Sequence, residues 1–297
     1  MSPKSSDNTS GNDSSSSSTD AAPLPLSPPI IAPGKPRPYT PLTHRELEDL
    51  RYARGLLENP GFAAKLSNLL GAPIEAGFKM LPKGWHTALN KTVRYSLERA
   101  LDAALLTIGG PPKRASEFMH KMLVGASGGL GGVFGFATLA IELPISTTIM
   151  LRSIADIARS EGHDVKDVIV RLNCLEVFAL GGASKEQANE SSYWAVRAAL
   201  GKSIEEAALH LSGKGITQKT APAVLRLISG ISSRFGLVVS EEAAAKAVPV
   251  VGAAAGAVVN ILFMDHFQNM ARGHFIVKRL ENKYGLGAVE SAYLHIK

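Results

Sequence analysis

The stretch around Ser127 carries the pattern of a serine nucleophile. Gly125 and Gly129 flank Ser127 in a G-x-S-x-G arrangement. Asp265 and either His266 or His274 follow in the chain order of acid and base that hydrolases with this motif use. Such a serine requires a strand before it and a helix after it. No strand pattern precedes Ser127, and its glycines recur at helical spacing. We therefore regard Ser127 as a weak catalytic candidate and keep a hydrolase as an alternative function.

Glu142 is an isolated carboxylate within an apolar stretch, directly before Leu143 and Pro144. A buried acid of this kind has a raised pKa and often belongs to a functional site. Together with Asp265 and His266, it would suit a lipid-directed enzyme. The alternative, which we favour, is that Glu142 caps a backbone break at the proline.

Two charged faces follow the apolar stretches. Arg152, Asp156 and Arg159 share one helix face by their spacing. A second face carries Asp265, Gln268 and Arg272. Charges beside apolar helices are costly unless they are paired. We hypothesise that the two faces meet, with Arg152 near Asp265 or Asp156 near Arg272, and the alternative is local pairing on a solvated surface.

The sequence predicts no metal site and no cofactor. His266 and His274 stand eight residues apart, so one helix would not present both closely to a metal ion. Cys174 is the sole cysteine, which excludes an internal disulfide and any multi-cysteine metal site. Neither a phosphate-binding G-x-x-x-x-G-K-[ST] loop nor an H-E-x-x-H motif is present.

Two uncharged runs rich in small residues must position these groups. They span residues 123–141 and 247–264, which are 19 and 18 residues long. Glycines spaced four apart form one stripe along a helix, where another backbone can approach closely, as in a glycine zipper. The glycines that we expect to pack in this way are Gly125, Gly128, Gly129, Gly131, Gly132, Gly135, Gly252 and Gly256.

The length of the two runs leaves three interpretations open. Each run approaches the length that spans a bilayer. Their glycines and the polar Asn260 make full insertion marginal. The runs could span the membrane, contact or partly enter it, or form the core of a soluble protein.

Nearly every segment after residue 42 has a helical pattern. Thr43 and Glu46 form a capping box that begins a first helix. Asp164 is expected to cap a later helix, and Pro222 to open another that ends near Phe235 and Gly236. Ser240 is expected to begin the last long stretch. With no alternation of strand and helix patterns, the sequence predicts an all-α, multi-helix bundle.

The N-terminal segment differs in composition from the rest. Residues 1–41 are rich in Ser and then Pro, so we expect a disordered tail before a helical domain at 42–297. The tail has no basic start followed by an apolar stretch, so no secretory signal is predicted. Residues 35–121 carry 14 Lys or Arg against 8 Asp or Glu, which suits an anionic surface. No nucleic-acid-binding motif accompanies these charges.

Several blocks of sequence resemble the EcsC family of bacterial proteins over roughly residues 45–297. They include AIELPISTT at 140–148, MLRSIADIAR at 150–159, EVFALGG at 176–182, PVVGAA at 249–254 and DHFQNMARGHF at 265–275; shorter matches are Tyr193–Arg197, Arg234–Gly236 and Asn260. The family takes its name from a protein encoded beside an ABC transporter. The resemblance implies a membrane-linked role and supplies no catalytic residues.

Together these observations favour a non-enzymatic, membrane-associated accessory or interaction protein. We expect it in the cytoplasm at the inner face of a bacterial cell membrane, not secreted. Its expected partners are the membrane surface or a membrane protein complex, such as an ABC transporter, and a second copy of itself, but not nucleic acid. A soluble helical scaffold that oligomerises through its glycines is a further alternative.

Overall fold

A computed structural model describes residues 41–58, 62–71, 74–108, 135–182, 192–214, 221–248 and 252–296. Contacts divide the chain into Met1–Pro41 and Leu42–Lys297. Within the described residues every element is a helix, which confirms the all-α fold class. The predicted tail lies outside the described residues, apart from Pro41. So do Ser127 and the glycines at positions 125–132.

Four helices form the N-terminal part of the described domain. They are α1 (His44–Glu58), α2 (Phe62–Leu70) and α3 (Glu75–Phe78), followed by the long α4 (Trp85–Thr107). The capping box at α1 is confirmed, because the Thr43 amide donates to Glu46 Oε2 at 3.0 Å and the Glu46 amide donates to Thr43 Oγ1 at 3.4 Å.

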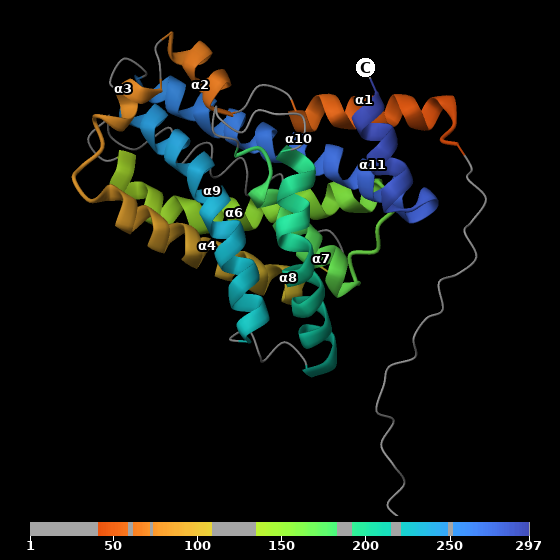
Figure 1. The fold of residues 1–297 in the computed structure, drawn as a ribbon. Coiled ribbons are helices and arrows are strands. Elements are labelled where there is room, and N and C mark those ends of the chain that lie inside the picture. The colour runs from red at the N-terminus through yellow and green to blue at the C-terminus, as the bar shows by residue number, and fades with distance from the viewer. Residues whose placement is uncertain are drawn as a thin grey trace, which may run out of the picture. The chain divides into compact units, whose positions relative to one another are not determined.

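The remaining helices complete the domain. They are α6 (Gly135–Ser160), α7 (Val168–Glu176) with the 3₁₀ turn η1 (Val177–Ala179), α8 (Ser192–Lys214), α9 (Pro222–Ala247), α10 (Gly252–Tyr284) and α11 (Leu286–His295). Figure 1 shows α4 and α6 side by side with α9 crossing them, while α1 lies along α10. The helix α8 packs against α9 and α7.

Three predicted helix boundaries are wrong. The helix that Pro222 opens does not end near Phe235 and Gly236 but continues to Ala247, so Ser240 lies inside α9 rather than at a helix start. Val238, Val239 and Ala243 are buried there, and tertiary packing therefore overrides the local stop signal. The cap of α7 is Asp167, whose carboxylate accepts from the Ile169 amide at 3.0 Å; Asp164 accepts from Lys166 in the preceding turn.

An aromatic cluster at the centre ties α9, α10 and η1 together. Phe178 of η1 lies 5.0 Å from Phe235 and 5.3 Å from Phe267 between ring centroids. Phe267 in turn packs edge-on against Phe263 of the same helix α10. These side chains are almost fully buried, so they fix the position of α10 relative to α9.

Gly77 and Gly273, two glycines outside the predicted set, lie close to a neighbouring helix. A Cβ atom added at Gly77 of α3 would clash with the backbone oxygen of Ala244 in α9. One added at Gly273 of α10 would lie 2.9 Å from the Ala53 oxygen and 2.7 Å from Leu57 in α1. Close backbone approach is therefore a feature of this fold. The predicted glycine zipper itself stays a prediction.

Candidate functional site

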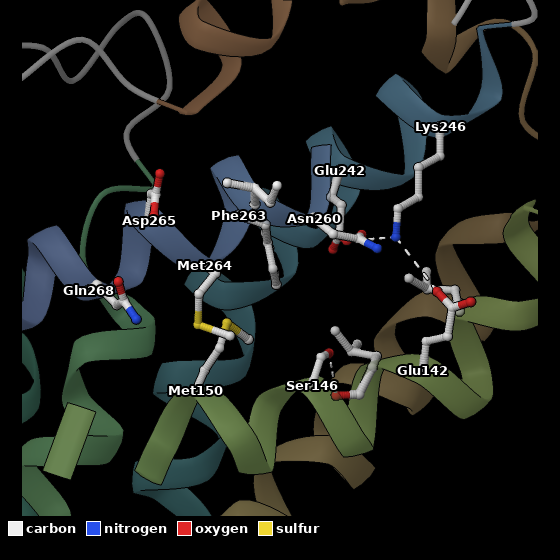
Figure 2. Close-up of a pocket in the computed structure, with 13 residues that line it drawn as sticks. Glu142, Ser146, Met150, Glu242, Lys246, Asn260, Phe263, Met264, Asp265 and Gln268 are labelled. Carbon is white, nitrogen blue, oxygen red and sulfur yellow. Dashed lines mark hydrogen bonds and ion pairs between the residues drawn. The ribbon is translucent and has the colours of Figure 1, made fainter. Parts of the chain in front are cut away.

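A cavity of about 160 Å³ lies between α6, α9 and α10. Residues from both predicted apolar runs line it, with Leu139 from the first and Ile261, Phe263 and Met264 from the second. The two runs therefore meet at one place, where their described ends form an apolar wall. Figure 2 shows Met150, Phe263 and Met264 between two polar ends of this cavity.

Lys246 occupies one polar end. Its ammonium lies 2.8 Å from Glu242 Oε1, one turn earlier on α9, and 3.7 Å from Glu142 Oε2 on α6 (Figure 2). Burial alone would lower the pKa of Lys246, but the two carboxylates outweigh it and raise that pKa above its usual value. Lys246 is therefore a protonated bridge between two helices and not a nucleophile.

Glu142 does not cap a backbone break. The helix α6 continues through Pro144, and hydroxyl groups on the following turn donate to carbonyls in this stretch. The Thr147 hydroxyl donates to the Leu143 oxygen at 2.6 Å, and the Thr148 hydroxyl donates to the Pro144 oxygen at 2.8 Å. Glu142 is thus held within a continuous helix, with its carboxylate at the cavity.

Asp265 and Gln268 line the opposite end of the cavity (Figure 2). The Gln268 amide donates to the Ser153 hydroxyl of α6 at 2.9 Å; Ser153 is not a member of the predicted face of Arg152, Asp156 and Arg159, so the meeting of the two faces stays a prediction. Asp156 forms an ion pair with Arg159 on its own helix. Arg152 and Arg272 are exposed, and within the described residues no ion pair joins Arg152 to Asp265 or Asp156 to Arg272.

The histidines proposed for chemistry lie elsewhere. His266 is buried against Phe62, with 5.5 Å between ring centroids, and its ring would contact any Cβ added at Gly181. Burial lowers the pKa of His266 to about 3, which keeps the ring neutral. The cavity therefore brings together Glu142 and Asp265 but not His266, and the predicted trio does not assemble.

His274 belongs to a second polar cluster that sequence reasoning missed. Its Nδ1 lies 3.1 Å from the Tyr193 hydroxyl, and its Nε2 lies 3.5 Å from Glu176 Oε2. Beside it, Arg197 of α8 makes two hydrogen bonds to Glu281 of α10, at 2.5 and 2.9 Å. These groups are nearly fully buried, and His274 Nε2 has no hydrogen-bond partner among the described residues. The two hydrogen bonds between Arg197 and Glu281 join α8 to α10, which indicates a structural role for that pair.

The described residues contain no group of three or more His, Cys, Asp and Glu side chains that could hold a metal ion. Of the residues at the cavity, sequence reasoning identified Glu142, Asp265 and Gln268. It missed Glu242 and Lys246, because their segment was read as a helix start. Their i, i+4 spacing is the signal that could have paired them.

The described residues form an all-α fold in which the described ends of the two small-residue runs line one pocket with two polar ends. The model of the EcsC protein family matches residues 46–280, and the chain therefore belongs to this family. Searches of curated proteins and of solved structures find no match.

Proposed function

We propose that the protein is a non-enzymatic accessory protein that associates with the inner face of a bacterial cell membrane from the cytoplasm. It binds the bilayer surface peripherally and serves a membrane protein complex, such as an ABC transporter. Association of the chain with itself remains part of this proposal. Nucleic acid is not a partner in it.

The observation that carries the proposal is an apolar groove between α4 and α6. Ile141 and Ile145 on α6 expose 70% and 40% of their surface, and Tyr95 on α4 exposes 52%. Arg99 and Arg152 line the same groove. Exposed aliphatic and aromatic side chains flanked by arginines suit the interface of an anionic bilayer.

The second apolar run supports the same role. On α10, Val258 and Ile261 expose 38% and 46% of their surface.

Of the described helices, α9 alone is long and apolar enough to cross a membrane, and 44% of its most apolar window is buried inside the protein. This is weak evidence for spanning, so surface contact is the form of association that we propose.

The chemistry of the cavity favours binding over catalysis. Lys246 is held protonated between two carboxylates. The Ser146 hydroxyl donates to the Leu143 oxygen at 3.1 Å, inside its own helix. Neither side chain is activated as a nucleophile by a neighbouring base.

Sedimentation of the full-length protein with lipid vesicles tests the proposal. We expect the protein to pellet with vesicles that contain phosphatidylglycerol, to pellet less with pure phosphatidylcholine, and to be released by high salt. Ile141→Asp should weaken binding by about tenfold, since it removes a large apolar side chain from the contact.

Leu209→Asp provides the matched control, because Leu209 is 76% exposed on α8 and lies outside the groove. It should leave vesicle binding unchanged. Equal effects of the two substitutions, or a protein that stays in the supernatant with both kinds of vesicle, would contradict the proposal. Pelleting that resists both salt and carbonate would show insertion instead.

A further inference from the structure

One oxygen of a buried carboxylate at the cavity lacks a partner. Glu242 uses Oε1 to accept from Lys246, while its Oε2 is buried and has no hydrogen-bond partner among the described residues. The Glu242 side chain is only 5% exposed. A buried acceptor left unsatisfied costs free energy, so a donor from outside the described residues is expected at this atom.

The charge of the cavity selects the kind of donor. Three carboxylates line it, from Glu142, Glu242 and Asp265, against the single ammonium of Lys246. A cation entering this space is attracted, whereas a carboxylate or phosphate is repelled. This also disfavours the headgroup of an aminophospholipid, because its phosphate would follow its ammonium into the same field.

The shape and lining select the rest of the ligand. Leu143, Met150, Phe263 and Met264 supply apolar side chains between the two polar ends. An apolar cavity of roughly 150 Å³ in another protein accommodates a molecule as large as benzene. The present cavity, at about 160 Å³, therefore has room for one ring or a short alkyl chain.

We propose that the cavity between α6, α9 and α10 binds a small primary amine with a short apolar body. The ammonium donates to Glu242 Oε2, and the apolar body lies among Leu143, Met150 and Phe263. The site is independent of the proposed membrane contact, since a free amine needs no bilayer to reach it. The two proposals therefore fail or succeed separately.

Calorimetric titration of the full-length protein with three six-carbon probes tests the site. Hexylamine should bind saturably, with a dissociation constant in the millimolar range or below, as expected for a ligand of this size. Hexanoate should not bind, and 1-hexanol should bind at least about tenfold more weakly than hexylamine. Equal binding of hexylamine and hexanoate would overturn the proposal. Binding of neither probe would also overturn it and would leave a site that holds only water.

Three variants assign the binding to the cavity. Glu242→Gln should weaken hexylamine about tenfold or more, because it removes the charge beside the ligand while keeping the side-chain shape. Asp265→Asn changes an exposed lining residue, so it keeps the fold and should weaken binding about threefold. Glu206→Gln removes the same charge from α8, outside the cavity, and should leave the affinity unchanged. If Asp265→Asn and Glu206→Gln have the same effect, the amine binds elsewhere and the proposal is wrong.

Discussion

At the scale of single residues, the buried ionisable groups differ in how their charge is compensated. Arg197 and Lys246 each have carboxylates within ion-pair distance. Glu241 has only a backbone hydrogen bond from Ala63 to lower its pKa, and burial outweighs this and raises the pKa to about 7. Its ionisation therefore opposes folding near neutral pH.

Glu241→Gln should stabilise the protein at pH 8 but not at pH 4. The folded protein binds a proton at Glu241 more tightly than the unfolded chain does, so wild-type stability falls as pH rises from about 4.5 to 7. The glutamine keeps an oxygen that accepts from the Ala63 amide, but it does not ionise and therefore does not lose stability as the pH rises. We expect a gain of about 2 kcal/mol in the free energy of unfolding at pH 8, measured by urea denaturation.

The pH dependence of Glu241→Gln separates this cause from a general effect on packing. Glu176, whose pKa burial raises to about 6, contributes a loss of the same sign in both proteins and cancels in the comparison. An equal gain at both pH values would show that the charge of Glu241 is not responsible.

At the scale of helices, the contact between α1 and α10 depends on the absence of a side chain at Gly273. The Leu57 side chain and the Ala53 carbonyl of α1 fill the space that a Cβ would occupy. Gly55, two residues before Leu57 on α1, has nothing within 4 Å of such an atom. Gly273 is thus crowded by the neighbouring helix, whereas Gly55 is exposed on α1.

Gly273→Ala should destabilise the protein by about 1–3 kcal/mol, because the added methyl group forces the two helices apart. Gly55→Ala should stabilise it by about 0.5–1 kcal/mol, because alanine is the better helix former at an open position. Thermal unfolding of both variants checks the pair. A stabilising Gly273→Ala would mean that α1 can shift at little cost.

Sequence reasoning was correct at two local signals, placed the cap of α7 at Asp164 instead of Asp167, and was wrong where packing decides. The capping box of Thr43 and Glu46 and the helix start at Pro222 depend on neighbours in the chain, and both were predicted. Gly236 was read as a helix end, although it lies buried inside α9. The glycines that approach backbones most closely, Gly77 and Gly273, stand in no repeated spacing, so only the fold identifies them.

At the scale of the whole molecule, the sequence was sufficient to predict the family and the all-α class. It identified only some of the residues that line the cavity. Glu142 and Asp265 stood out because they are charges next to apolar runs. Glu242 became a candidate only when the fold showed α9 to be continuous beside α6. Gln268 donates to Ser153, a serine outside the predicted face that no charge pattern would select.

Removal of residues 1–41 should leave the unfolding temperature unchanged to about 1 °C, because a Ser- and Pro-rich segment buries little apolar surface. Scanning calorimetry of the shortened and full-length chains checks this. Deletion through residue 46 is the control and should lower the unfolding temperature, since Glu46 also forms an ion pair with Lys283 of α10 at 2.7 Å. A large drop after the shorter deletion would show that the segment packs on the domain.

Cys174 gives the folded molecule a built-in reporter. It is the sole cysteine of the chain, it lies fully buried in α7, and burial raises its pKa to about 12. Because alkylating reagents attack the thiolate, they should modify this sulfur only in molecules that have opened. Pulsed alkylation would therefore count transiently unfolded molecules in a mixture or a cell extract, and an engineered surface cysteine could carry a dye without competing background.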